Sequence, residues 1–178
     1  MKPGQWVVIS GIGGLGHVAV QYAVAMGMRI VAVDIADDKL ELAKRHGAEV
    51  VVNAKDADPV PAVVEATKGG GHGILVTAVH PQDFDQAIGM SRKLGTIVVV
   101  GLPPAKTEVP IFDVVLNRIA IRGSIVGTRH DMVEALDFFA RGLITPTIAT
   151  RKLDEINDIF GEMHRGEIDG RIVIDDAK

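Results

Sequence analysis

The chain is 178 residues long, carries a formal net charge of −4 and contains no cysteine. This length allows one domain with a sizeable core, while the lack of thiols excludes disulfides and thiolate metal ligands. The 19 basic residues are scattered, which argues against nucleic acid as a partner. No apolar run approaches the roughly 20 residues of a membrane span, and Met1 to Gln5 do not begin a signal peptide. We therefore expect a cytoplasmic protein with no membrane partner.

Short β-branched runs alternate with longer amphipathic segments along most of the chain. Continuous apolar runs of this kind are typical of strands that are buried on both faces of a parallel sheet. The expected strands are Trp6 to Ser10, Arg29 to Val33, Glu49 to Asn53, Gly73 to Thr77, Thr96 to Val100 and Ala120 to Ile125. The expected helices are Leu15 to Met26, Asp37 to His46, Pro59 to Lys68, Gln82 to Leu94 and Asp113 to Arg118, and Gly47, Gly69 and Gly95 are expected to end three of them. The pattern predicts an α/β domain, a doubly wound six-stranded parallel sheet with helices on both faces.

The run Gly-Ile-Gly-Gly-Leu-Gly at Gly11 to Gly16 joins the first expected strand to the first expected helix. Gly11 permits a tight turn, Gly13 lets the backbone approach a pyrophosphate, and Gly16 lets the helix pack closely on the strand. Asp34 ends the second strand, where a carboxylate accepts hydrogen bonds from ribose hydroxyls and repels a 2′-phosphate. The combination predicts a dinucleotide site that prefers NAD. The alternative is an ordinary strand-turn-helix with structural glycines and a surface aspartate.

The pattern changes after the sixth strand. We expect a helix from His130 to Arg141, an extended piece at Thr147 to Thr150, a helix from Asp154 to His164 and a final strand from Arg171 to Ile174. These elements do not fit a six-stranded scheme. We therefore expect a dinucleotide-binding domain at residues 1–146 and a C-terminal segment at residues 147–178. This segment is either a small addition or the returning part of another domain.

Seven segments together carry a resemblance that covers nearly the whole chain. They are GIGGLGHVAVQYAVAMG, VAVDIADDKLELAKRHGAEVVVN, VTAV, VVVGLP, IRGSIVGTRHD, EALDFFARGL and GRIVID. In this order they resemble the cofactor-binding half of microbial zinc-dependent alcohol dehydrogenases of the medium-chain type. The resemblance implies the Rossmann fold, NAD as cofactor, and hydride transfer between an alcohol and nicotinamide in the parent enzyme.

The resemblance also assigns roles to individual residues. Gly13, Gly14 and Leu15 would line the pyrophosphate within the loop from Gly11 to Gly16, and Asp34 and Lys39 would hold the adenosine ribose. Thr77, Ala78 and Val79 would lie beside the cofactor, and Val100, Leu102, Ser124 and Val126 would flank the nicotinamide. Arg171 would reach a cofactor phosphate, although its position alone fits a plain surface cation equally well.

The family's catalytic domain precedes this fold, binds zinc through cysteine and histidine, and has no counterpart in the chain. We therefore expect a truncated or dissected dehydrogenase that binds NAD(H), provides no metal ligands and is inactive alone; the sequence does not identify the alcohol. One alternative is a zinc-free reductase of the quinone oxidoreductase type, which would prefer NADPH and which Asp34 disfavours. The other is an NAD-sensing module without catalysis. The resemblance further implies a homodimer or higher homo-oligomer, formed through an edge strand at about Thr107 to Ile111.

The six histidines show no pair with the i, i+4 spacing of a helical zinc site. His17 is expected either to contact a phosphate or to lie on the helix surface. His80 is a candidate for contact with the cofactor. We expect the other four to be surface residues, namely His46, His72, His130 and His164.

Overall fold

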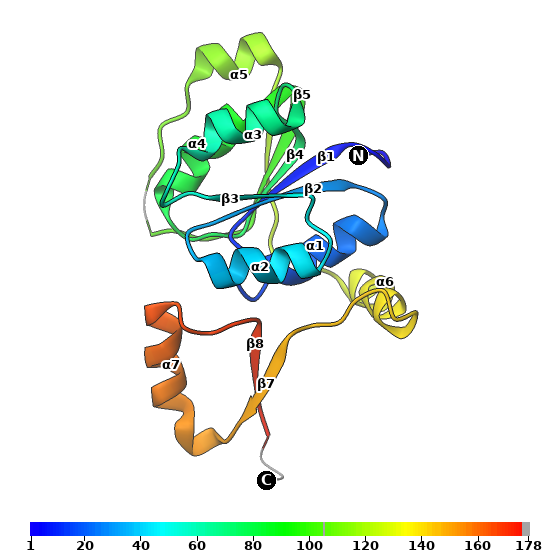
Figure 1. The fold of residues 1–178 in the computed structure, drawn as a ribbon, viewed down its shortest axis with the longest axis vertical. Helices are drawn as coiled ribbons and strands as arrows, with labels where there is room; N and C mark the ends of the chain where they lie inside the picture. The colour runs from blue at the N-terminus through cyan, green and yellow to red at the C-terminus, as the bar shows by residue number, and fades with distance from the viewer. Residues whose placement is uncertain (105, 176–178) are drawn as a thin grey trace.

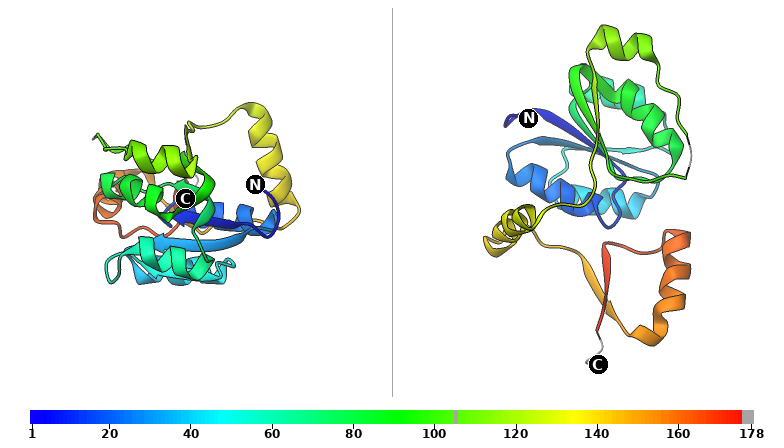
Figure 2. Two further views of the ribbon diagram at one scale, coloured as in Figure 1. Left: turned by 90° about the horizontal axis from the view of Figure 1, so that it is seen from above. Right: turned by 180° about the vertical axis from the view of Figure 1, so that it is seen from behind.

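The computed structural model describes residues 1–104 and 106–175. Its centre is a six-stranded parallel sheet with the strand order β3-β2-β1-β4-β5-β6 (Figures 1 and 2). The strands are β1 (Trp6–Ser10), β2 (Arg29–Asp34), β3 (Val50–Asn53), β4 (Gly71–Val76), β5 (Ser91–Val99) and β6 (Ala120–Gly123). The order reverses between β1 and β4, and ligands of such sheets bind at the carboxyl ends of the strands at this point. The doubly wound α/β fold predicted from the sequence is confirmed.

Helices cover both faces of the sheet (Figure 1). Residues of α1 and α2 pack on one face, whereas residues of α3, α4 and α5 pack on the other. The bounds are α1 (Gly16–Ala25), α2 (Asp37–Arg45), α3 (Pro59–Thr67), α4 (Pro81–Met90) and α5 (Ile111–Asn117). Neighbouring strand residues point to opposite faces, so Val8 joins the α3 and α4 core while Ile9 joins the α1 and α2 core. Burial on both sides explains why the strands read as unbroken apolar runs.

The segment between α4 and β5 differs from the sequence prediction. The sequence predicted a helix that continues to Leu94 and ends at Gly95, but α4 ends at Met90 and β5 begins at Ser91. The pairing of β5 with β4 shifts register here, and residues 92–95 form a bulge in which Leu94 has a φ of 65°. A Cβ atom at Gly95 would overlap the hydroxyl of Ser91. Gly95 is therefore needed for this bulge and not for the end of a helix.

The other helix-ending glycines are as predicted. Gly47 and Gly69 follow α2 and α3 with φ values of 99° and 123°, in the left-handed region that glycine adopts without strain. Two predicted boundaries are corrected. The sixth strand ends at Gly123 and not at Ile125, and the helix expected from Asp154 begins as a short 3-10 turn.

After β6 the chain forms α6 (Arg129–Ala140), which contacts α1 through Tyr22. The C-terminal unit lies beyond α1 and α2 (Figure 1) and consists of β7 (Ile148–Arg151), the 3-10 turn η1 (Leu153–Glu155), α7 (Ile156–Arg165) and β8 (Arg171–Ile174). Strands β7 and β8 are parallel and form a two-stranded sheet that is separate from the main one. None of the helices in the described part of the chain has both the length and the apolar character needed to cross a membrane.

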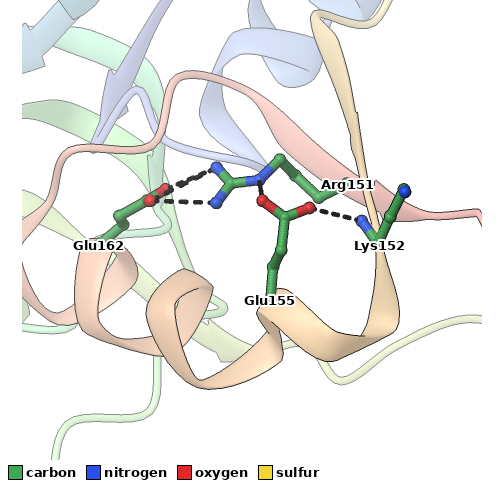
Figure 3. Close-up of polar contacts among 4 residues, drawn as sticks. All are labelled: Arg151, Lys152, Glu155 and Glu162. Atoms are coloured by element: carbon green, nitrogen blue, oxygen red, sulfur yellow. Dashed lines mark hydrogen bonds and ion pairs between the residues drawn. The ribbon is translucent and has the colours of Figure 1, made fainter.

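A cluster of charged side chains fixes α7 to the end of β7 (Figure 3). The guanidinium of Arg151 donates to Glu155 at 2.8 Å and lies 3.4 Å from the carboxylate of Glu162. The other carboxylate oxygen of Glu155 accepts a 2.8 Å bond from the backbone N–H of Lys152. This backbone bond, followed by the bond from Arg151, lowers the pKa of Glu155. The cluster therefore links the strand, the turn and the helix of the small unit.

Helix α1 holds the beginning of the C-terminal region in place. The Tyr22 hydroxyl donates a 3.0 Å hydrogen bond to the carbonyl of Ala135 in α6. The Gln21 side chain makes two bonds with the backbone of Thr145, donating to its carbonyl at 3.2 Å and accepting from its N–H at 2.7 Å. Gln21 is almost fully buried, so these bonds are shielded from water. The C-terminal region is thus attached to the same helix that follows the glycine-rich loop.

Candidate functional site

The glycine-rich loop between β1 and α1 is shaped by two close backbone approaches. Gly11 has a φ of 89°, and a Cβ atom there would lie 2.7 Å from the backbone nitrogen of Ala78. A Cβ atom at Gly16 would overlap the carbonyl oxygen of Gly11. Gly13 is different, because a Cβ atom there would meet nothing within 4 Å. Gly11 and Gly16 are therefore required by the turn itself, whereas Gly13 faces open space.

Helix α1 begins beside this open space without a capping side chain. Its N-cap residue is Leu15, and the first turn contains no acidic residue. Backbone N–H groups at a helix start have no partner within the helix, so they attract anions when no side chain caps them. The loop and the start of α1 together form a cradle that fits a phosphate group.

Asp34 is the last residue of β2, and its side chain contacts the glycine-rich loop. Its Oδ2 accepts a 2.6 Å hydrogen bond from the N–H of Ile12, and its Oδ1 accepts bonds from Ile35 and Ala36 at 2.8 and 3.1 Å. The carboxylate is thus fixed by three backbone amides. Each carboxylate oxygen can accept more than one bond, so the side chain still has capacity for the hydroxyls of a ribose.

The loop after β4 braces the glycine-rich loop. The Thr77 hydroxyl donates to the carbonyl of Gly11 at 2.7 Å, and the backbone N–H of Ala78 donates to Ser10 at 3.2 Å. A Cβ atom at Gly101, after β5, would overlap the carbonyl oxygen of Ala78. The carboxyl ends of β1, β4 and β5 are therefore held together by close backbone contacts.

Two basic side chains reach this region from different parts of the chain. A Cβ atom at Gly14 would lie 3.0 Å from the guanidinium carbon of Arg171, at the start of β8. The ammonium of Lys39, in α2, lies 4.0 Å from the Cβ position of Gly166, after α7. The described structure gives the Arg171 guanidinium no hydrogen bond or ion pair that would turn it away from the loop. The C-terminal unit therefore adds a cation beside the phosphate cradle.

These groups surround a cleft of about 620 Å³. This volume lies within the roughly 300–1,000 Å³ that ligand pockets occupy. Its lining comprises Gly11, Gly13, Gly14, Leu15, Val33, Asp34, Ile35, Lys39, Ala54, Thr77, Ala78, Val79, His80, Gln82, Asp83, Gln86 and Arg171. The structure thus brings together eleven of the residues that the sequence singled out, His80 included, from the glycine-rich loop, the end of β2, α2, the β4 loop and β8.

The remaining predicted residues lie outside the lining of the cleft. Gly16 packs behind it against Gly11. The four residues assigned to the nicotinamide follow β5 and β6, and they are Val100, Leu102, Ser124 and Val126. Leu102 is 78% exposed and Val126 is 94% exposed, so neither makes a closed pocket in this chain. Their position at the carboxyl ends of neighbouring strands remains consistent with the predicted role.

The sequence did not reveal a carboxylate on the floor of the cleft. Asp83, in the first turn of α4, accepts a 3.1 Å hydrogen bond from the hydroxyl of Ser10, which is buried at the end of β1. Burial is the main cause of the raised pKa of Asp83, and the nearby charge of Asp34 raises that pKa further. The hydrogen bond from Ser10 and the charge of His80 lower the pKa and so act in the opposite direction. No local motif marks Asp83, because its partner is 73 residues away in the sequence.

The structure corrects some of the predictions that the sequence made for the histidines. His17 is neither a phosphate contact nor a surface residue, because its side chain is fully buried and bonded to the backbone at both ring nitrogens. His80 lines the cleft and caps α4, accepting from the N–H of Gln82 at 3.3 Å. His46 and His72 are half-buried and not on the open surface, and burial is the main reason that the pKa of each is lowered. His130 and His164 are exposed as expected.

A metal site is not formed by the side chains of the described residues. Among residues 1–104 and 106–175, no group of three or more His, Cys, Asp and Glu residues is placed to hold a metal ion. A structural or catalytic zinc site needs three or four such ligands around one point. Within the described part of the chain, the residues therefore fit a phosphate-containing cofactor but offer no group that fits zinc.

Comparison with known proteins agrees with this geometry. A family model described as zinc-binding dehydrogenase matches residues 14–141. The chain belongs to this family. Within the zinc-binding dehydrogenases it corresponds to the NAD-binding part of the zinc-dependent medium-chain alcohol dehydrogenases. It is 59% identical over 174 residues to an alcohol dehydrogenase of Moraxella sp. (strain TAE123), a match that covers 98% of this chain and 51% of that protein.

Solved structures of other dehydrogenases share the fold. The alcohol dehydrogenase of the hyperthermophilic archaeon Aeropyrum pernix superposes with a TM-score of 0.93 at 32% identity, over 98% of this chain and 51% of that one. The acetophenone reductase of Geotrichum candidum, solved in complex with NAD, superposes with a TM-score of 0.85 at 28% identity, over 99% of this chain and 50% of that one. The chain spans about half the length of the curated relatives it matches.

Proposed function

We propose that this chain binds NAD(H) in the 620 Å³ cleft and serves as the cofactor-binding part of an alcohol dehydrogenase. The observation that carries the proposal is the phosphate cradle, in which open space at Gly13 lies beside the uncapped start of α1 and the guanidinium of Arg171. The pyrophosphate would occupy this cradle. The acetophenone reductase structure, which contains NAD, supports the same reading of the shared fold.

The specificity for NAD over NADP follows from Asp34. Its carboxylate is fixed by three backbone amides and lines the cleft at the end of β2. A 2′-phosphate at this position would meet a like charge, whereas ribose hydroxyls would donate to it. Lys39 also lines the cleft and would contact the same ribose. The nicotinamide would be flanked by residues that follow β5 and β6, namely Val100, Leu102, Ser124 and Val126.

The whole enzyme would transfer a hydride between an alcohol and the nicotinamide, as the names of the relatives suggest. A zinc ion would polarise the alcohol oxygen. Its ligands would come from a part of the enzyme outside this chain, because the described residues offer no such group. Residues 147–178 would belong with that catalytic part, and the enzyme would act as a cytoplasmic homo-oligomer.

Isothermal titration of the purified chain with NADH and NADPH tests the proposal. We expect NADH to bind and to bind more tightly than NADPH. The variant Gly13→Val should weaken binding of both cofactors about ten- to a hundredfold without unfolding the chain. A tighter complex with NADPH would instead favour a zinc-free reductase of the quinone oxidoreductase type. The absence of binding to both cofactors would refute a nucleotide-binding role.

A further inference from the structure

One buried side chain connects the glycine-rich loop to the C-terminal unit. The Nδ1 atom of His17 lies 2.9 Å from the carbonyl oxygen of Gly13, and its Nε2 atom lies 3.2 Å from the backbone nitrogen of Thr147. A carbonyl can only accept and an amide can only donate, so both bonds are satisfied by a neutral ring with its hydrogen on Nδ1. The imidazole therefore bridges the backbone of Gly13, four residues before His17, and that of Thr147, 130 residues after it.

Thr147 is also hydrogen-bonded to Arg171. The carbonyl of Thr147 accepts a 2.9 Å hydrogen bond from the backbone N–H of Arg171, at the start of β8. Gly170, with a φ of 70°, makes this approach possible, because a Cβ atom there would overlap the Thr147 carbonyl oxygen. The guanidinium of Arg171 in turn lies beside Gly14. The contacts therefore form a closed path from the glycine-rich loop through His17 and Thr147 to Arg171 and back to the loop.

We infer that His17 is a positioning residue for the cofactor pyrophosphate, acting through Arg171. This inference rests on the proposed binding of NAD(H). The ring keeps Gly13 and Thr147 at one separation, so the guanidinium and the loop amides reach the same phosphate. A charged bond from Arg171 to that phosphate requires this placement, because such bonds are strong only in good geometry.

The role is separable from the folding of the C-terminal region. The side chain of Gln21 holds the backbone of Thr145 to α1 by two further bonds. Removal of the His17 ring therefore leaves this region attached to α1, while the spacing between Thr147 and the loop is no longer fixed. We expect His17 variants to keep their fold and to lose cofactor affinity.

A double-mutant cycle with Arg171 tests the inference by titration of the chain with NADH. His17→Leu should raise the Kd for NADH about tenfold, the loss of roughly one well-placed hydrogen bond to a charged group. In an Arg171→Gln background the same change should alter the Kd by less than about twofold, because the group it positions is gone. The exposed His164→Leu should leave the Kd unchanged. An equal loss in both backgrounds would show that His17 only supports the fold.

Two conservative variants separate the two bonds and decide the matter even if His17→Leu does not fold. Glutamine carries an acceptor near the position of Nε2 and asparagine carries a donor near that of Nδ1. His17→Gln should therefore retain most of the affinity for NADH, whereas His17→Asn should lose it. The reverse order would overturn the inference.

The same titrations distinguish this inference from the proposed function. If the unmodified chain does not bind NADH, the proposed function is wrong and the positioning role falls with it. If NADH binds and Gly13→Val weakens binding while the cycle shows no coupling between His17 and Arg171, only the positioning role is wrong.

Discussion

The carboxylate of Asp34 is bonded to the glycine-rich loop, because its Oδ2 accepts a 2.6 Å hydrogen bond from the backbone N–H of Ile12. The same side chain lines the cleft where a ribose would lie. One residue therefore fixes the turn between β1 and α1 and sets the charge at the end of β2. Substitutions of Asp34 should affect both the stability of the turn and the choice between NADH and NADPH, to different degrees for different side chains.

Asp34→Asn removes the charge and keeps the shape of the side chain, but its single acceptor oxygen can serve either Ile12 or the pair Ile35 and Ala36, so part of the backbone bonding is also lost. We expect it to narrow the preference for NADH over NADPH by about 1–3 kcal/mol, through weaker bonds to the ribose hydroxyls and relief of repulsion with the 2′-phosphate. Asp34→Ala should narrow the preference similarly and lower the melting temperature further than Asp34→Asn, since Ile12, Ile35 and Ala36 all lose their acceptor. Calorimetric titration and thermal unfolding measure the two effects. Equal affinities of the unmodified chain for both cofactors would contradict the role of Asp34.

Gly13→Val should weaken NADH and NADPH alike. A valine side chain would occupy the open space beside the start of α1, where the pyrophosphate would approach the backbone. We expect the Kd of each cofactor to rise about ten- to a hundredfold, or about 1.4–2.8 kcal/mol.

The fold of Gly13→Val should persist, because a Cβ atom at this position meets nothing within 4 Å. Thermal unfolding of the variant without cofactor serves as the control. Gly16→Val is the contrasting variant and should lower the melting temperature strongly, since its Cβ atom would overlap the Gly11 carbonyl oxygen. An unchanged Kd for Gly13→Val would place the phosphates elsewhere.

Local patterns predicted the sheet and the loop because each depends on neighbouring residues. The strands at Trp6–Ser10 and Arg171–Ile174 were predicted with the bounds that the structure shows. The bulge before Gly95 was not, because Ser91 to Leu94 fits a helical pattern and the cause of the bulge is its pairing with β4. Tertiary pairing thus overrides local propensity in this segment.

The parts of the site that the sequence did not reveal are long-range contacts. Ser10 and Asp83 meet across 73 residues, and His17 meets Thr147 across 130. No periodicity or motif records such distances. The resemblance to dehydrogenases implied that Arg171 would reach a phosphate, but only the structure shows that it lies against Gly14.

A homodimer is expected from the resemblance, and the structure suggests where to test it. Residues 107–110 form no regular strand, and Ile111 begins α5, so the expected edge strand at Thr107 to Ile111 is not formed within the single chain. Strand β6 is one of the two edge strands of the main sheet, the other being β3, and its Ile121 is 43% exposed. An unpaired strand edge can pair with another copy.

Sedimentation velocity at tens of micromolar, roughly ordinary assay concentrations, should therefore show a dimer. Ile121→Lys should shift it to monomer if β6 forms the contact, and Ile111→Lys should do so if the segment before α5 forms it. Val64→Lys, on α3 and also partly exposed, is the matched control. A monomer in the unmodified chain would contradict the expectation.

Asp83 should make the stability of the chain depend on pH. Burial is the main reason that its pKa is raised in the folded state, so the folded chain binds the proton more tightly than the unfolded chain does. The stabilisation by this proton is complete below the ordinary carboxyl pKa of about 4, and it is lost as the pH rises through the raised folded pKa. Above the raised folded pKa, the charged carboxylate of Asp83 is therefore less favourable in the folded chain than a neutral side chain would be.

Asp83→Asn tests this dependence, because asparagine is neutral at every pH and keeps an acceptor oxygen for the Ser10 hydroxyl. We expect its melting temperature to exceed that of the unmodified chain at pH 7, and the difference to vanish as the pH falls toward about 4. Asp56→Asn, at an exposed turn after β3, is the matched control and should show no such trend. A difference that stays constant with pH would mean that the amide changes packing and not charge. A variant less stable at pH 7 would show that the Ser10 bond to the carboxylate outweighs the cost of burying its charge.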